Sequence, residues 1–217
     1  MIDAESTDGT VALAQAAGAE IVVRPWPGFV AARREALALV RSEWTLMLDA
    51  DESLDPALRT AIEAAAPDGV DGYLLRRVTF LCGRPVWGAG WGDERLLRLF
   101  RTGAVRLEAR PAAGGSAELH ERWVTDGLVE ELGGTLLHDS YPTLASYREK
   151  FARYTSLEAA GLRAGAADVL RAFAVAVARF GWLLVVRGGW RDGWRGAYVS
   201  LFSALYPAVV VVKAARR

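Results

Sequence analysis

Three acidic residues directly follow an apolar stretch in the first quarter of the chain. Residues 44–48, Trp-Thr-Leu-Met-Leu, run into Asp49, Ala50, Asp51 and Glu52. This pattern predicts a buried strand that places carboxylates at its carboxyl end, where open α/β sheets bind ligands. Two Asp residues one position apart can both reach a hard cation such as Mg²⁺ or Mn²⁺, which completes its shell with substrate phosphates. A solvated turn or a helix N-cap would use the same residues, so the motif alone leaves both interpretations open.

The segments before the acidic stretch alternate between strand-like and helix-like patterns. A short apolar start ends at Asp3, and a Ser-Thr-Asp-Gly-Thr turn over residues 6–10 leads into a helix predicted for residues 11–17. A second strand is expected at residues 20–24 and an Ala-rich helix at residues 29–40. Strand, helix, strand, helix, strand is the order that predicts an α/β fold with a mostly parallel sheet and flanking helices.

The composition is that of one ordinary globular domain with a C-terminal appendage. The 217 residues are 52% hydrophobic and 24% charged, which excludes a disordered or fibrous chain. One cysteine, Cys82, and two histidines exclude an internal disulfide framework and a structural zinc site, and favour a reducing, cytosolic setting. No secretory signal sequence is expected at the start. We expect a catalytic domain at residues 1–140 and a helical, membrane-associating segment at residues 141–217.

The C-terminal part differs from the rest in charge and hydropathy. Residues 171–217 carry eight basic residues and one acid, a net +7, and the remainder of the neutral chain therefore carries −7. A helical pattern over residues 141–163 precedes apolar runs at residues 169–186 and 196–212, the second with 17 uncharged residues. Because Pro207 interrupts this second run, we expect an amphipathic segment at the membrane surface rather than a span; a helical cap over the sheet is the alternative. Tryptophans suited to the headgroup level stand at Trp182, Trp190 and Trp194.

Several motifs, taken in order along the chain, resemble those of a known family. The first half shows Asp3 before the Ser-Thr-Asp-Gly-Thr turn, Gly28-Phe29 before a basic helix, and the acidic stretch, as in family 2 glycosyltransferases with the GT-A fold. The second half resembles the branch that contains the lipopolysaccharide-core β-glucosyltransferases. Its motifs are Phe80-x-Cys82-Gly83-Arg84, Gly90-Trp91-x-Asp93, Arg98-Leu99-Phe100-Arg101, His120-Glu121, Leu137-His138, Lys150-x-x-x-Tyr154 and Gly189-Trp190-x-Asp192-Gly193-Trp194-x-Gly196.

The resemblance implies an inverting transferase that moves a sugar from a nucleoside-diphosphate sugar to a lipid-linked or lipopolysaccharide-type glycan. Because the departing diphosphate gains charge, a bound Mg²⁺ or Mn²⁺ would neutralise it. Asp51 is our first choice of metal ligand, and Asp49 would help through the ribose or a metal-bound water. A His that follows the sheet, His138, would complete the shell; a purely structural role is the alternative for both His138 and His120. Glu52 would cap the next helix or touch the donor sugar.

Other residues would bind the nucleotide. Asp3 is expected at the base or ribose edge, unless it only starts its turn. Arg33 is expected to contact the nucleotide. The next residue, Arg34, stands where the family usually has Asn. Arg98 and Arg95 would hold the pyrophosphate or, alternatively, lie on the solvated face of a strand in Arg-Leu-Leu-Arg-Leu-Phe-Arg.

An inverting transfer also needs a carboxylate to take the proton from the acceptor hydroxyl. The resemblance places Glu121 on the acceptor side, and Asp93 in the Gly-Trp-x-Asp stretch is the rival. The family normally begins with a further strand and helix, so we expect that this chain starts inside the next strand. A catalytically impaired remnant that partners a membrane glycan-assembly complex is therefore the alternative function, and a nucleotidyltransferase is a third.

The expected partners are a nucleotide-sugar donor, a glycolipid or oligosaccharide acceptor and the membrane surface, but no nucleic acid. A lipid-linked acceptor would require the enzyme to meet its substrate at a bilayer. We therefore expect a cytoplasmic protein that lies peripherally on the inner face of the cell membrane.

Overall fold

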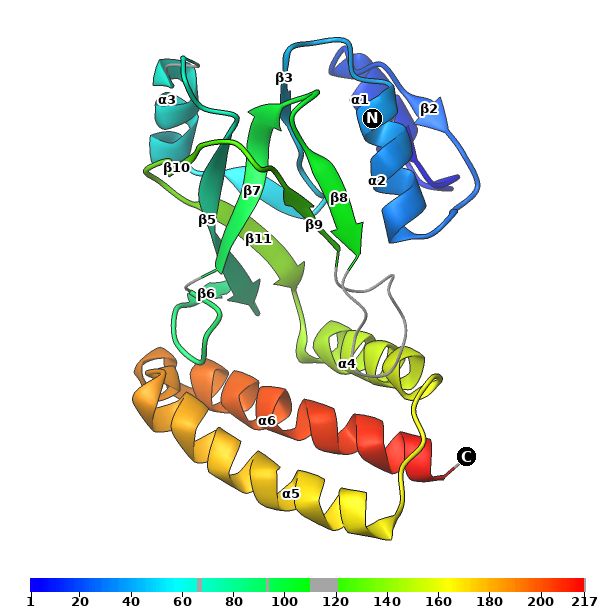
Figure 1. The fold of residues 1–217 in the computed structure, drawn as a ribbon, viewed down its shortest axis with the longest axis vertical. Coiled ribbons are helices and arrows are strands. Elements are labelled where there is room, and N and C mark those ends of the chain that lie inside the picture. Colours follow the sequence, from blue (N-terminus) through cyan, green and yellow to red (C-terminus); the bar gives the residue numbers. More distant parts are fainter. Residues whose placement is uncertain (66–67, 93, 110–120, 217) are drawn as a thin grey trace.

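The computed structural model describes residues 1–65, 68–92, 94–109 and 121–216. Helices and strands alternate through the first third, strands dominate the middle, and helices form the end (Figure 1). The strands are β1 Ile2–Asp3, β2 Val22–Val23, β3 Trp44–Leu46, β4 Glu52–Leu54, β5 Gly72–Leu81, β6 Arg84–Val86, β7 Glu94–Arg101, β8 Arg106–Ala109, β9 Glu121–Val124, β10 Val129–Glu131 and β11 Leu136–Tyr141. The helices are α1 Thr10–Ala16, α2 Phe29–Ala38, α3 Pro56–Ala64, α4 Leu144–Ala159, α5 Ala166–Gly181 and α6 Gly193–Ala215, with a π-helical turn at Trp182–Val186 and a 3-10 turn at Gly189–Asp192.

The central sheet is a curled, mixed sheet. Its main path runs β3-β7-β5-β11-β4, and β6 and β10 also pair with β5. Strand β5 pairs in parallel with β10 and β11, whereas the β3–β7, β7–β5, β5–β6 and β11–β4 pairs are antiparallel. The expected α/β class is confirmed, but the expectation of mostly parallel pairing is wrong for this sheet. The alternation of strands and helices along the chain predicts that helices cover a sheet. It does not predict which strands pair, because pairing depends on contacts between distant segments, here β3 with β7.

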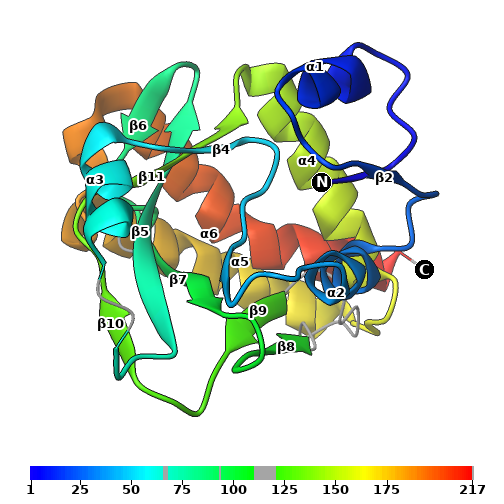
Figure 2. The same ribbon diagram turned by 90° about the horizontal axis from the view of Figure 1, so that it is seen from above.

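The first two strands form a separate unit. β1 and β2 pair in parallel, with Asp3 opposite Val23, in a two-stranded sheet of their own. Helix α1 connects them, as the strand–helix–strand pattern predicts. Figures 1 and 2 show this unit at one side of the molecule, beyond α2. β3 therefore continues into the central sheet without a parallel neighbour from this unit.

Two apolar clusters cover the sheet. On one side Leu58 of α3 packs on Tyr73 and Leu75 of β5 and on Leu136 of β11. Asp55 begins α3 by accepting a hydrogen bond from the Leu58 amide, and Pro56 occupies the first helical position. The second cluster joins Leu97 and Phe100 of β7 to Leu107 and Trp123 of the β8–β9 ribbon, and α2 packs against it through Val30 and Leu37. These clusters fix the ends of β3 and β4, between which the acidic residues lie.

Three helices stack beneath the sheet. α6 contacts both α4 and α5, and α5 forms the outermost layer at the bottom of Figure 1. A cluster that includes Leu81, Tyr147 and Val199 joins α4 and α6 to the end of β5. The turn before α6 packs closely, because a Cβ on Gly196 would collide with the carbonyl oxygen of Gly189. The two apolar runs predicted for the C-terminal segment form α5 with the π-helical turn after it, and α6, and the two helices pack against each other.

Two stretches are long and apolar enough to cross a membrane by length and composition. They are Ala166–Val186, which contains α5, and Gly189–Ala215, which contains α6. The expectation that Pro207 breaks the second run is wrong, because α6 continues through it. Packing against α4 and α5 holds the helix where the proline removes one backbone hydrogen bond. The less buried of the two is Ala166–Val186, so α5 and not α6 is the more exposed apolar helix.

Candidate active site

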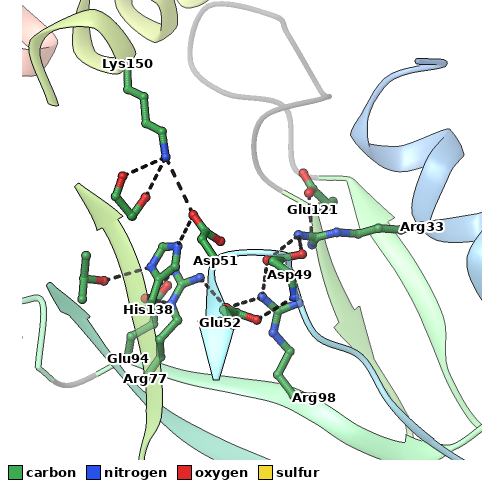
Figure 3. Close-up of polar contacts among 12 residues, drawn as sticks. Arg33, Asp49, Asp51, Glu52, Arg77, Glu94, Arg98, Glu121, His138 and Lys150 are labelled. Carbon is green, nitrogen blue, oxygen red and sulfur yellow. Dashed lines mark hydrogen bonds and ion pairs between the residues drawn. The ribbon is translucent and has the colours of Figure 1, made fainter. Parts of the chain in front are cut away.

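Asp49 and Asp51 lie in the turn between β3 and β4, and Glu52 begins β4, whereas the sequence predicted a strand that reaches the carboxylates. β3 ends at Leu46, and Glu52 is already the first residue of β4. The turn closes on itself, because the Glu52 amide donates to the Asp49 carbonyl oxygen at 3.0 Å and the Asp49 amide donates to Glu52 Oε2 at 3.0 Å. This closed turn points Asp49, Asp51 and Glu52 in different directions (Figure 3).

Asp51 faces the partly exposed side of the turn. Its Oδ2 lies 3.3 Å from His138 Nε2 and 3.8 Å from Lys150 Nζ. His138 is within reach because the antiparallel register sets it opposite Glu52, and Thr79 Oγ1 contacts its Nδ1 at 3.2 Å. The hydrogen bond with His138 lowers the pKa of Asp51 to about 2; burial opposes this shift, and the charge of Lys150 adds to it. Asp51 is therefore an ionised carboxylate, and its side chain is 38% exposed.

Asp49 is bound by two arginines. Arg33 Nη2 lies 2.8 Å from Oδ1 and 3.0 Å from Oδ2, and Arg98 Nη2 lies 2.6 Å from Oδ2. Burial raises the pKa of Asp49, but the charges of Arg98 and Arg33 outweigh it, and the pKa lies below its usual value. Both carboxylate oxygens accept hydrogen bonds from guanidinium groups, so the charge of Asp49 is compensated by Arg33 and Arg98 in this structure, and its role as a metal ligand stays a prediction.

Glu52 is the buried carboxylate of the site, with a side chain of 0% exposure. Its Oε1 accepts from Arg98 Nη2 at 2.8 Å and from Arg77 Nη1 at 3.1 Å. Arg77 also binds Glu94 Oε2 at 2.7 and 2.9 Å; burial lowers the pKa of Arg77, but Glu94 and Glu52 together raise it. Arg98 is thus buried between carboxylates, which differs from both sequence interpretations, a pyrophosphate ligand and a solvated strand face.

Glu121 joins this network from the β9 side. Its Oε1 lies 3.0 Å from Arg33 Nη1, and its side chain is only 7% exposed. One guanidinium therefore links Glu121, the predicted base, to Asp49 of the acidic turn (Figure 3). The structure brings together five of the predicted site residues, namely Asp49, Asp51, Arg33, Arg98 and Glu121, and places His138 beside them.

Two other predicted residues are not part of the described network. Asp3 is buried in the β1–β2 unit, where its carboxylate accepts from the Ser6 amide at 2.8 Å and from Ser6 Oγ at 2.7 Å. These contacts match the interpretation in which Asp3 organises its turn. Asp93, the rival base, lies outside the described residues, as does His120.

A divalent cation fits this site only if the substrate supplies part of its shell. No cluster of three or more His, Cys, Asp or Glu side chains suited to a metal occurs within the described ranges. Asp51 provides an oxygen donor, and His138 provides Nε2 beside it in the tautomer that carries its proton on Nδ1, next to Thr79 Oγ1. A cation bound there would replace the hydrogen bond that Nε2 otherwise donates to Asp51. Mg²⁺ is commonly held by one or two protein ligands together with substrate phosphates and water, so this pair fits a cation that bridges protein and diphosphate.

Sequence reasoning did not assign site roles to Arg77, Glu94 and Lys150. Arg77 and Glu94 face each other across the antiparallel β5–β7 pair, and only knowledge of that pairing would have connected them. Lys150 had a signal in the Lys-x-x-x-Tyr motif on the helix that follows His138. Because Lys150 is far from the acidic turn in the sequence, the motif did not predict that Lys150 lies beside Asp51.

The fold and the acidic turn define the class of protein. A mixed α/β sheet flanked by helices, with carboxylates in a turn at a strand end, is consistent with the GT-A fold of glycosyltransferases. The sequence model described as "Glycosyl transferase family 2" matches residues 1–122, more than half of the chain. The chain belongs to this family.

Curated relatives agree with this assignment. The chain is 33% identical over 167 residues to "Lipopolysaccharide core biosynthesis glycosyltransferase LpsC" of Rhizobium meliloti, an alignment that covers 73% of this chain and 60% of the relative. It is 40% identical over 82 residues to an uncharacterized glycosyltransferase of Rickettsia conorii, covering 37% of this chain and 29% of that protein. It is also 44% identical over 104 residues to a TPR repeat-containing protein of Synechococcus elongatus, covering 46% and 24%. The chain thus spans at most about 60% of the length of these relatives.

Proposed function

We propose that this chain is an inverting glycosyltransferase that moves a sugar from a nucleoside-diphosphate sugar to a lipid-linked or lipopolysaccharide-type glycan. The observation that carries the proposal is the arrangement around Asp51. The neighbouring carboxylates Asp49 and Glu52 are bound by arginines, whereas Asp51 is ionised and partly exposed beside His138. The family match and the relative named for lipopolysaccharide core biosynthesis support the reaction and acceptor classes.

The residues in and around the turn would have two roles: some bind the donor, and others hold the carboxylates in place. A cation held by Asp51 and His138 would act as a Lewis acid on the diphosphate. Arg33 and Arg98 keep Asp49 ionised and fixed, and Glu52 anchors the turn from below through its bonds to Arg98 and Arg77. A turn held this rigidly presents Asp51 without reorganisation, which is the condition for effective electrostatic stabilisation.

Glu121 would take the proton from the acceptor hydroxyl. The acceptor oxygen forms its bond to the anomeric carbon, the bond from that carbon to the diphosphate oxygen breaks, and its electron pair stays on the diphosphate. Glu121 Oε1 lies 3.0 Å from Arg33 Nη1, so this guanidinium would orient the base. Arg33 also holds the Asp49 carboxylate and would thereby keep the base at a fixed distance from the donor side.

Replacing Asp51 with Ala is expected to weaken metal-dependent nucleotide binding at least tenfold. The cation would lose one of its two proposed protein ligands, and the removed carboxylate is the most exposed of the three in the acidic stretch. Calorimetry with UDP or GDP in the presence and absence of Mn²⁺ measures the effect. Asp139→Ala is the matched control, because Asp139 is an exposed neighbour of His138 on β11. Equal affinity of wild type and Asp51→Ala would contradict the site assignment. No nucleotide binding by the wild type would favour the alternative, an impaired partner of a glycan-assembly complex.

We further propose that α5 and the turn after it bring the protein to the cytoplasmic surface of the membrane. α5 carries exposed apolar side chains over much of its length, with Leu170 77% and Val177 74% exposed. At the turn, arginines lie over half-exposed tryptophan rings, in the pairs Arg187–Trp182, Arg191–Trp190 and Arg195–Trp194. Apolar side chains beside aromatic and basic ones suit the boundary between lipid tails and anionic headgroups.

The double substitution Leu170→Glu with Val177→Glu is expected to reduce binding to anionic lipid vesicles at least tenfold. Both side chains lie on one face of α5, seven positions apart, and burying each contributes roughly 1.5–3 kcal/mol. Cosedimentation with phosphatidylglycerol vesicles measures binding, which should also weaken at high salt. Leu13→Glu with Leu128→Glu adds the same charge at exposed sites outside the C-terminal helices and should leave binding unchanged. Release from cell membranes by detergent alone would point to a span instead, and wild type found only in the soluble fraction would refute the proposal.

A further inference from the structure

Lys150 reaches the candidate active site from the C-terminal helices. It lies on α4, outside residues 1–122 that match the family, and its side chain extends back over the end of β11 (Figure 3). Its Nζ lies 3.0 Å from both the carbonyl oxygen and Oγ of Ser140, and 3.8 Å from Asp51 Oδ2. The ring of Tyr141 lies beneath it, with the centroid 5.2 Å from Nζ.

The arginines of the site differ from Lys150 in how fully they are neutralised. Arg33, Arg77 and Arg98 each contact two carboxylates at 3.1 Å or less. Their charge is therefore already balanced within the network. An arginine in that position holds carboxylates in place. Because they already balance its charge, it attracts a further anionic ligand only weakly.

The Lys150 ammonium retains a donor for a ligand. It has three N–H groups, and Ser140 accepts from two of them. Across the described part of the chain, its one carboxylate contact is Asp51, at a distance longer than a hydrogen bond. The side chain is 36% exposed, so an anion can reach it. A cation with one free donor, fixed beside an ionised metal-ligand candidate, is the arrangement that suits a phosphate oxygen.

We infer that Lys150 binds the diphosphate of the donor, on the side of Asp51 opposite Arg33 and Arg98 (Figure 3). This inference rests on the proposed function. As the bond between the anomeric carbon and the diphosphate oxygen breaks, the electron pair stays on the diphosphate, and the fixed ammonium stabilises the added charge without transferring a proton. Arg98, which the sequence suggested for the pyrophosphate, is enclosed by Asp49 and Glu52, and Lys150 takes that role.

This role also makes the C-terminal helices part of the donor site. α4 starts from a capping box in which Thr143 and Ser146 bind each other's backbone amides, so the helix begins at a fixed point after β11. Tyr147, one turn before Phe151, packs into the cluster shared with α6. The position of the Lys150 ammonium therefore depends on the packing of the helical layer against the sheet.

Calorimetry on the full chain tests the inference, with UDP and GDP as probes in the presence of Mn²⁺. Lys150→Gln should weaken binding of the nucleoside diphosphate at least tenfold, and Lys150→Arg should stay within a few-fold of wild type because it keeps the charge. Arg153→Gln is the matched control, since it removes one positive charge from the same helix and should change affinity less than twofold. Uridine and guanosine, which lack phosphates, should bind Lys150→Gln and wild type equally.

The possible results of this calorimetry distinguish a failure of the Lys150 inference from a failure of the proposed function. Unchanged nucleoside-diphosphate affinity in Lys150→Gln overturns the inference and leaves the proposed function intact. An equal loss of uridine or guanosine affinity also overturns it, because Lys150 would then support the fold of the site rather than the phosphates. If wild type binds neither UDP nor GDP, the proposed function itself fails, and the inference fails with it.

Discussion

Replacing Glu121 with Gln is expected to lower turnover by roughly two to four orders of magnitude, the range typical of a lost general base. The amide keeps the size of the side chain but cannot take the proton of the acceptor hydroxyl. Donor binding should remain close to wild type, because Asp51, His138 and Lys150 are untouched and Arg33 keeps its two bonds to Asp49. Single-turnover kinetics, together with calorimetry of nucleotide binding, separate the two effects.

Two further variants make this test specific. Glu108→Gln, on the β8 strand that pairs with β9, changes another carboxylate that binds arginines and should leave turnover within about twofold. Asp93→Asn examines the rival base suggested by the sequence. A large loss in Asp93→Asn with little change in Glu121→Gln would transfer the base to Asp93. Loss of donor binding in Glu121→Gln would give Glu121 a structural role instead.

The sequence predicted which acidic residues lie together better than it predicted their contacts. The apolar stretch before Asp-x-Asp-Glu predicted a strand over residues 44–48, and β3 forms there but ends at Leu46, so the carboxylates lie in and after a turn; their role in an active site stays a prediction. His138 followed from the resemblance, and the antiparallel register of β11 with β4 explains why it meets Asp51. The family match extends to residue 122, so it covers the acidic turn but not His138 or Lys150.

What the sequence could not predict depends on contacts between distant strands. The alternation of Arg and Leu in β7 suggests one solvated face, yet residues 97–100 are all buried, because one apolar cluster covers Leu99 and the other covers Leu97 and Phe100. Arg98 is tolerated there only because two carboxylates from the acidic turn compensate its charge. A strand pattern shows which residues alternate, whereas burial of both faces depends on what packs against each side.

The C-terminal segment shows the same limitation for helices. Composition alone favoured residues 196–212 as the membrane-facing run, because they form the longest stretch without charges. In the structure that run lies in α6, which packs between α4 and α5, and its apolar surface is partly used in that packing. The charge-interrupted α5 carries the larger exposed apolar surface. Hydropathy measures how apolar a helix is, but not which neighbours cover it.

Arg98→Met is expected to destabilise the protein by about 3–5 kcal/mol at neutral pH, the range for breaking a buried ion pair by removing one partner. Methionine fills a similar volume, but Asp49 and the fully buried Glu52 each lose a charged donor at 2.6 and 2.8 Å. Urea denaturation measures the change in the free energy of unfolding. Arg95→Met is the control on the same strand; its exposed ion pair with Glu131 should contribute no more than about 1 kcal/mol.

The destabilisation by Arg98→Met should shrink in acid. Arg98 is one cause of the lowered pKa of Asp49, so the wild-type ion pair stabilises the fold above the ordinary Asp value of 3.8 and loses that contribution as the pH falls through the lower, folded-state pKa. A protonated carboxyl needs no cationic partner, and the difference between variant and wild type should therefore narrow below about pH 4. If the loss in the free energy of unfolding does not change with pH, it comes from packing around residue 98 and not from the ion pair. If that loss is less than about 1 kcal/mol at neutral pH, Arg33 and Arg77 hold the acidic turn without Arg98.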